Sequence, residues 1–344
     1  MGVVDTNLAT SVATRLSPAG PQLSLTEAAD VVIMLRDLTD EAEQHVRDVT
    51  GLKGVVGPAT VVDRPGWAKA NIEGFQHVLA PLEQTLLAKQ NKVAGAVTAK
   101  VTAVQMGTLM SWLSSKVLGQ YEAFQPEGQA GRLLLVAPNI VEAERRLGVD
   151  PHDFRLWVAL HEVTHRTQFT AVDWLHAHVR SEINALLKAS ALDDPDALLT
   201  RLKQVAKAPR SGGSLAQLLQ TPEQREVMDR VTGFMSLLEG HAEHVMDGVG
   251  PSVVPSVQHI RDRFEERRRA RGNPLERVLR RLLGLDQKAL QYAEGSVFVR
   301  EVVAAVGMTG FNRVWESPAT LPSRQEILAP AEWVSRLHGS AASA

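Results

Sequence analysis

The five residues from position 161 to 165 constrain this chain more than any other part of its sequence, because they read His-Glu-Val-Thr-His. An α-helix has about 3.6 residues per turn, so side chains four positions apart lie on one face. His161 and His165 could therefore bind one zinc ion through their imidazole rings. Glu162 would then lie beside the water that the metal activates and could act as its general base.

The residues before this motif predict a helix that begins at Pro151. Asp150 is a favourable N-cap residue, and proline is well tolerated at the first helical position. Residues 154–160 are mostly apolar, which is typical of a buried helix. A single histidine on such a helix is usually an ordinary core residue, but two histidines and a glutamate together need polar partners. We therefore favour a metal site over a purely structural role for this group.

The residues that follow the motif exclude one class of zinc site. A catalytic zinc ion takes three protein ligands and leaves the fourth position for water. The metzincin pattern HExxHxxGxxH supplies its third ligand from the same segment, but this chain has Gln168 and Ala171 where that pattern requires glycine and histidine. The third ligand must therefore come from elsewhere in the chain.

A later helix, predicted from a capping box at residues 221–224 to about residue 247, offers that ligand. Glu239, Glu243 and Asp247 repeat every four positions on it, so one face carries three carboxylates. Apolar neighbours favour a buried face over a solvated one, and Gly240 would let another helix approach closely. We predict Glu239 as the third ligand and Glu243 as a hydrogen-bond acceptor for a ligand imidazole, with the order of these two roles left open.

Several further motifs carry a resemblance to a known family. They lie at residues 64–71, 119–121, 138–140, 154–169, 237–247 and 310–318. In this order they resemble a family of zincin-like hydrolases, largely actinobacterial, whose members are often associated with biosynthesis of the deazaflavin coenzyme. The resemblance covers about residues 25–338. It implies a gluzincin-like zinc site built from His161, His165 and a downstream glutamate, but it implies no substrate.

The resemblance also implies a zincin-like α+β fold that is predominantly helical, with an HExxH helix, a small β element and a second ligand-bearing helix. We expect residues 1–24 to be flexible, residues 25–338 to form a single catalytic unit or two packed lobes with the cleft between them, and residues 339–344 to be a tail. Residues 131–139 are the clearest strand. In zincins an edge strand binds extended substrate by β-augmentation, so this strand has either that role or a plain core role.

Composition narrows the partners and the location that we expect. The chain has 344 residues and a net charge of −2, and its isoelectric point of about 6.6 argues against a nucleic-acid partner. The apolar stretch at residues 101–113 is shorter than the roughly 20 residues that span a bilayer, so we expect no membrane segment. There is no cysteine, and the N-terminus does not resemble a signal peptide. We therefore expect a cytoplasmic protein.

These observations predict a zinc-dependent metallopeptidase that cleaves a peptide or a small amide, with Glu162 as general base. The transition-state oxyanion needs a donor besides zinc, and His241, His244 and Tyr292 are the candidates. Two alternatives remain. The first is a zinc-stabilised scaffold or binding protein without turnover, and the second is a small-molecule amidohydrolase in cofactor metabolism. The sequence leaves the oligomeric state open.

Overall fold

The computed structural model describes residues 4–87, 92–123, 125, 131–191, 221–269 and 285–339. Helices dominate these residues and their strands form a small sheet, which confirms the predicted α+β, predominantly helical class. The chain divides into two compact units, of which unit 1 is Met1–Ala171 with Val245–Asn273 and unit 2 is Val172–His244 with Pro274–Ala344. Within the described ranges, no helix combines the length and the apolar character that crossing a membrane requires.

The sheet of unit 1 contains β1 (Thr60–Val62), β2 (Gly119–Glu122) and β3 (Arg132–Val136) in the order β1-β3-β2. β3 pairs in parallel with β1 and antiparallel with β2, so that Leu134 lies opposite Thr60 and Gln120. β3 is therefore a central core strand, and the alternative that it binds substrate at a free edge is wrong. The sequence did not reveal β2, because four residues without an apolar pattern give little strand signal.

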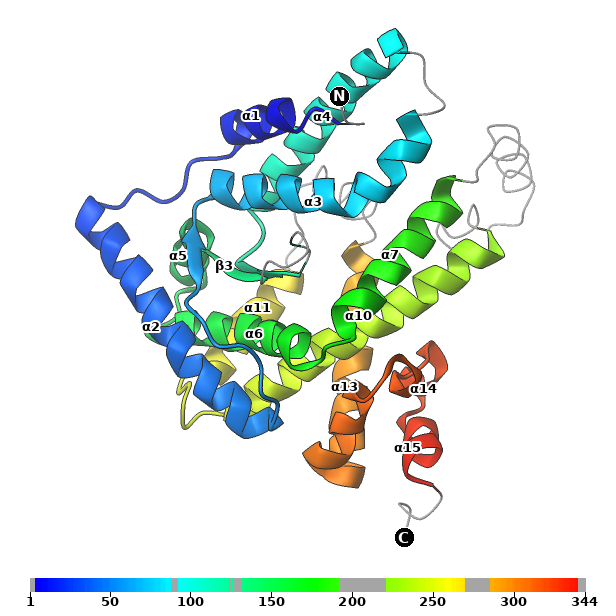
Figure 1. Cartoon of the computed structure of the whole chain (residues 1–344). Coiled ribbons are helices and arrows are strands. Elements are labelled where there is room, and N and C mark those ends of the chain that lie inside the picture. Colours follow the sequence, from blue (N-terminus) through cyan, green and yellow to red (C-terminus); the bar gives the residue numbers. More distant parts are fainter. Residues whose placement is uncertain are drawn as a thin grey trace. The chain divides into compact units, whose positions relative to one another are not determined.

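One face of β3 packs against the layer that carries the His-Glu-Val-Thr-His motif. Successive side chains of a strand point to opposite faces, and Leu133 and Leu135 belong to the same core as the buried residues of α2 (Leu25–Thr50), α6 (Pro151–Ala171) and the end of α10 (Pro222–Val249). Figure 1 shows α6 on this side of β3, and α6 also contacts β2. α6, the helix that carries the motif, therefore packs directly against the sheet.

The other face of β3 packs against three N-terminal helices. Leu134 and Val136 share a second core with residues of α1 (Thr6–Leu16), α3 (Arg64–Leu87) and α4 (Lys92–Ser114). In Figure 1, α3 lies across β3 from α6. The sheet is therefore the middle layer of unit 1.

Residues 6–16 differ from the flexible segment that we predicted, because they form α1. The carboxylate of Asp5 accepts a hydrogen bond from the Leu8 N–H at 3.0 Å and so caps this helix. Ala9 and Ala13 are buried against α4. A Cβ atom at Gly107 would lie 2.5 Å from the Ala9 carbonyl oxygen. Small residues on both helices therefore let α1 and α4 pack closely. In the sequence, residues 6–16 show only a weakly apolar pattern, which does not predict this contact.

Hydrogen bonds at both ends fix the position of α6. At its start, the Asp150 carboxylate accepts from the Asp153 N–H at 3.0 Å, which confirms the predicted cap. Nearby, Arg155 donates two hydrogen bonds, at 2.9 and 2.6 Å, to buried Glu144 of α5 (Ala137–Leu147). At its other end, Thr170 accepts from the Val55 N–H at 2.9 Å. Such a helix can hold side chains in a fixed geometry.

Unit 2 contains α7 (Leu175–Ala191), the greater part of α10, α13 (Leu285–Phe311), α14 (Arg324–Leu328) and α15 (Pro330–His338), with short 3₁₀ helices at Asn312–Trp315 and Pro318–Thr320. α10 begins with the predicted capping box, in which Thr221 and Gln224 exchange hydrogen bonds of 2.9 and 3.0 Å. It continues without a break to Val249. From Val245 onward its residues belong to unit 1, as does α11 (Val257–Arg269).

Within unit 2, α10 and α13 touch through their backbones. A Cβ atom at Gly240 would lie 2.2 Å from the carbonyl carbon of Gly295. A Cβ atom at Gly295 would lie 1.9 Å from the backbone carbonyl oxygen of Ser236. No side chain larger than hydrogen fits at either position.

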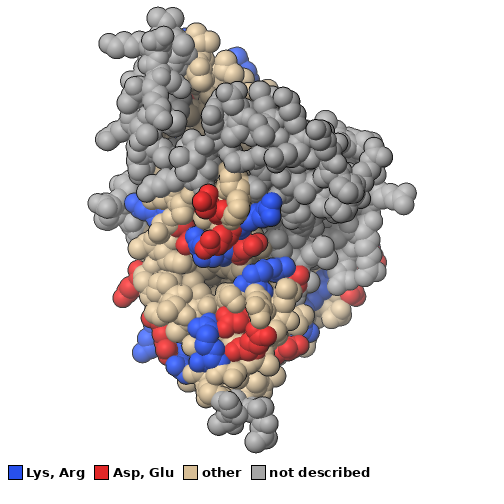
Figure 2. Space-filling view, turned by 90° about the vertical axis from the view of Figure 1, so that its right-hand side faces the viewer, with Lys and Arg blue, Asp and Glu red and all other residues tan. Residues whose placement is uncertain are grey.

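On the molecular face shown in Figure 2, acidic and basic side chains alternate and do not gather into an area of one sign.

Candidate metal centre

The two histidines of the motif lie on one face of α6, as their spacing predicts. Their Nε2 atoms are 3.1 Å apart, and their rings meet edge to face with centroids separated by 4.6 Å. The arrangement brings two imidazole nitrogens to a single point. Desolvation first, and the neighbouring charge of His165 second, lower the pKa of His161 to about 3. His161 is therefore neutral near pH 7, which is the form of imidazole that binds metals.

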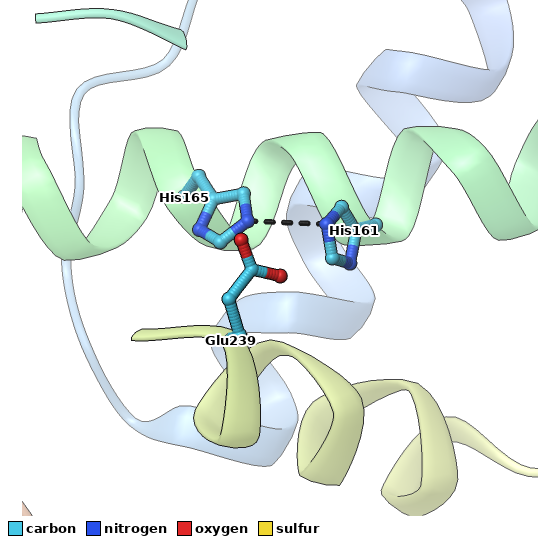
Figure 3. A group of neighbouring side chains, drawn as sticks. All are labelled: His161, His165 and Glu239. Carbon is cyan, nitrogen blue, oxygen red and sulfur yellow. Dashed lines mark hydrogen bonds between the residues drawn. The ribbon is translucent and has the colours of Figure 1, made fainter. Parts of the chain in front are cut away.

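Glu239 completes a group of three potential ligands. Ligand atoms of His161, His165 and Glu239 all lie within 4.8 Å of one another, and all three residues are partly accessible. Figure 3 shows the Glu239 carboxylate directed from α10 toward the two rings on α6. Glu239 precedes Val245 on the same unbroken helix by less than two turns, and Val245 is fully buried in the core that contains α6.

The donor set and its spacing fit zinc. Two imidazole nitrogens and one carboxylate oxygen are a common protein ligand set of catalytic zinc sites, which keep the fourth position open. Ligand atoms at about 2.0–2.1 Å from a tetrahedral ion lie roughly 3.3 Å from each other. The separation of 3.1 Å between the two Nε2 atoms is close to this value.

Gln168 adds a contact that the sequence did not predict. Its Oε1 atom lies 2.9 Å from His165 Nδ1, the ring nitrogen on the side away from His161. Gln168 is fully buried. We had expected Glu243 to accept a hydrogen bond from a ligand imidazole, and for His165 the acceptor is Gln168. The spacing of three residues places Gln168 beside His165 on one helix face, but spacing alone does not show which ring nitrogen the amide oxygen faces.

Glu162 is buried against the edge of the sheet. Only 7% of its surface is exposed, and the backbone of Gly119 in β2 lies beside it. A Cβ atom at position 119 would be 2.6 Å from Glu162 Cγ and 2.7 Å from Cδ. Gly119 therefore provides the space that the Glu162 side chain occupies. This role is not visible in the sequence alone, because it depends on a contact between distant segments.

The remaining candidates lie in different surroundings. His241 is fully buried in unit 2, where it stacks on Phe311 with ring centroids 5.3 Å apart and meets Trp315 edge-on at 5.4 Å. This aromatic packing favours a structural role. His244 and Glu243 are half-buried on α10, and both of their predicted roles stay predictions. Tyr292 belongs to α13, but its side chain lies outside the described part of the chain.

The third carboxylate of the predicted stripe has a different partner. Asp247 forms an ion pair with Arg261 of α11, both in unit 1. A further group of potential metal ligands, Asp150, His152 and Asp153, lies at the start of α6. Asp150 caps the helix there, and Asp153 accepts a hydrogen bond from the Ser256 N–H at 2.7 Å. Local hydrogen bonds therefore explain these acidic residues without a metal.

The chain is similar to a known protein family and to a solved structure. A model of the zincin-like metallopeptidase family matches residues 4–334. A crystal structure from Chloroflexus aurantiacus, described as that of a presumed hydrolase with a novel fold, is similar with a TM-score of 0.69 and 31% sequence identity. The similarity covers 97% of this chain and 99% of that chain. Among curated proteins, none matches the chain.

Proposed function

The chain belongs to the zincin-like metallopeptidase family, and from this membership and the geometry of its site we propose that it is a zinc-dependent hydrolase of peptide bonds. One observation carries the proposal. The ligand atoms of His161, His165 and Glu239 lie within 4.8 Å of one another, and the residue that follows His161 is a buried glutamate. A site that only stabilises the fold has no use for that glutamate.

His161, His165 and Glu239 would hold the zinc ion. When bound, zinc would supply Lewis acidity and lower the pKa of water toward about 7. Glu162 would take the proton from the attacking water and return it to the leaving nitrogen. Its burial next to Gly119 favours this role, because the surrounding residues hold the carboxylate in place. His244 and Tyr292 stay candidates for the donor to the oxyanion.

The sheet edge supports an extended peptide as substrate. β2 is at the edge of the described sheet, and its first residue, Gly119, touches Glu162. A peptide that pairs with such an edge would be held by backbone hydrogen bonds that do not depend on its sequence. Its scissile bond could then lie close to the general base. We therefore prefer a peptide to a small amide as the substrate.

Digestion of a peptide library by purified zinc-loaded protein, with and without a chelator, tests this proposal. We expect cleavage that the chelator abolishes and that added zinc restores. Glu162→Gln should retain one zinc ion per chain and lower kcat by about 100- to 10,000-fold, because it removes the base. Glu182→Gln, which changes a half-buried carboxylate on α7 that pairs with Arg230, is the matched control and should keep full activity.

Other outcomes would separate the alternatives. Protein that holds no zinc after expression with ample zinc would remove the basis of the proposal. Zinc-loaded protein that cleaves small amides but no peptide would support an amidohydrolase, including the role in deazaflavin-coenzyme metabolism that the sequence resemblance suggested. Zinc-loaded protein that cleaves neither would support a scaffold. Full turnover in Glu162→Gln would show that another group is the base.

A further inference from the structure

His165 can bind a metal through Nε2 only when that atom carries a lone pair and no proton. A neutral imidazole has one N–H and one bare nitrogen, and the partner of one nitrogen decides which form is present. His165 Nε2 faces His161 Nε2 at 3.1 Å. His165 Nδ1 faces Gln168 Oε1 at 2.9 Å.

An amide oxygen accepts hydrogen bonds and cannot donate them. The contact with Gln168 Oε1 therefore requires the proton of His165 to be on Nδ1. This leaves the lone pair on Nε2, the atom directed toward His161. From this geometry we propose that Gln168 is a positioning residue that holds His165 in its metal-binding tautomer before any metal arrives, an inference that rests on the proposed zinc site.

The surroundings of Gln168 suit this task. Gln168 is fully buried, so bulk water does not compete for the acceptor. It lies three residues after His165 on the same helix, and the turns of α6 fix the distance between them. Second partners of ligand histidines are often carboxylates. A neutral amide orients the ring without adding a negative charge to a site that already holds the carboxylates of buried Glu162 and partly accessible Glu239.

The tautomer can be measured without metal or substrate. Long-range ¹H–¹⁵N spectra of protein labelled at histidine nitrogens distinguish a protonated ring nitrogen from a bare one, and a His165→Asn variant assigns the signal. We expect metal-free protein at pH 8 to show His165 with its proton on Nδ1. Gln168→Leu should shift His165 toward a mixture of both tautomers. A wild-type ring protonated on Nε2 would overturn the proposal.

Zinc affinity, measured by competition with a chelator, provides the second readout. Gln168→Leu should weaken binding by about 10- to 100-fold, as loss of such a partner typically does. Gln168→Glu restores an acceptor at the same place and should regain most of the lost affinity. Thr170→Val is the matched control, because it removes a different hydrogen bond of α6, the one with Val55. It should leave zinc affinity unchanged even where it lowers stability.

The outcomes distinguish this inference from the proposed function. Wild-type protein that binds no zinc would contradict the zinc site itself, while the tautomer measurement would still test Gln168. Wild-type protein that binds zinc, with Gln168→Leu no weaker than Thr170→Val, would overturn the role of Gln168 alone. If Gln168→Leu does not fold, Gln168→Glu and the wild-type spectrum decide the question.

Discussion

Glu162 keeps its position because residue 119 has no side chain. A Cβ atom there would come within 2.9 Å of three side-chain atoms of Glu162, including Oε1. All three atoms belong to a flexible side chain, so Glu162 can turn away without disturbing the backbone. A methyl group at position 119 would therefore displace the carboxylate of Glu162 and have little effect on the stability of the fold.

Gly119→Ala should therefore lower turnover while the fold and the bound zinc persist. We expect kcat to fall by about 100-fold, because a displacement near 1 Å of a catalytic group can have such an effect. Gly57→Ala is the control, since a Cβ atom at Gly57 meets nothing within 4 Å. Turnover, zinc content and thermal stability should be measured for both variants. Equal activity in the two would contradict the placement of Glu162 by Gly119.

Glu239 and Glu243 differ in their position relative to the histidines. Only Glu239 joins the group of ligand atoms within 4.8 Å. We expect Glu239→Ala to weaken zinc binding by more than about 100-fold, whereas loss of an outer hydrogen-bond partner at Glu243 should cost about 10- to 100-fold at most. Chelator competition on both variants gives the ranking. A larger loss in Glu243→Ala would exchange the two roles.

At the scale of residues, the sequence predicted the members of the site whose chemistry depends on local spacing. His161, Glu162 and His165 follow from positions on one helix. Gly119 and Gln168 could not be assigned in the same way. The role of Gly119 depends on a contact between a strand and a helix, and the role of Gln168 depends on which ring nitrogen its amide oxygen faces.

Among the elements, the crossing of α10 and α13 shows how backbone contact limits substitution. A Cβ atom at Gly240 would lie 2.2 Å from the carbonyl carbon of Gly295 and 2.3 Å from its oxygen. These are backbone atoms, so only separation of the helices would relieve the clash. Gly233 on the same helix is different, because a Cβ atom there would meet its nearest neighbour at an ordinary 3.6 Å.

The two glycines should therefore respond to alanine with opposite signs. Gly240→Ala should lower the free energy of unfolding by about 1–3 kcal/mol, as overpacking does. Gly233→Ala should raise it by about 0.5–1 kcal/mol, because alanine is the better helix former. Urea denaturation of the metal-free variants measures both effects. A stabilising Gly240→Ala would show that the helices do not cross so closely.

The ion pair between α14 and α15 predicts a dependence of stability on pH. Burial by itself raises the pKa of Glu326, but hydrogen bonds and charge from Arg336, together with hydrogen bonds from Ser323, outweigh it and lower the pKa below its ordinary value of 4.5. A carboxyl group with a lowered pKa stabilises the fold above its unfolded pKa. This contribution is lost as the pH falls through the folded pKa.

Glu326→Gln should therefore destabilise the protein near pH 7 by about 1 kcal/mol, the range of a partly exposed ion pair. The variant keeps the capping pattern, because glutamine can replace glutamate at this position of the helix. The difference in free energy of unfolding between wild type and variant should shrink as the pH falls below 4.5. A difference that stays constant from neutral to acid pH would contradict the lowered pKa.

The predicted elements were accurate where capping or apolar pattern is local. α6 and α10 begin where their caps indicated. β3 was found, but its place between two other strands was not, because strand order depends on contacts far apart in sequence. β2 was missed because four residues are too short to give a clear strand pattern. α1 was missed because close contact with α4, a distant segment, stabilises it.

Each of the two units of the whole molecule is built from two separate stretches of the chain. The chain leaves unit 1 after Ala171 and returns to it at Val245, near the C-terminal end of α10. No local signal marks this return, because the helix is continuous across it. The sequence is therefore compatible both with one unit and with two packed lobes.

A metal held by ligands far apart in sequence should stabilise the native state as a whole. The unfolded chain does not bring Glu239 near His161, so zinc binds it less well, and binding adds to the free energy of unfolding. At a free zinc concentration 100 times the Kd, the gain is about 2.7 kcal/mol. We expect zinc to raise the Tm of metal-free protein and a chelator to reverse this.

Glu239→Ala separates this effect from unspecific binding. In the metal-free state the variant should have a Tm close to that of wild type, because Glu239 is partly accessible and its loss leaves no large cavity. Added zinc should then raise the Tm of wild type and of the Glu182→Gln control, but not that of the variant. A zinc-dependent rise that persists in Glu239→Ala would mean that the ion binds elsewhere, and that α6 and α10 do not hold it together.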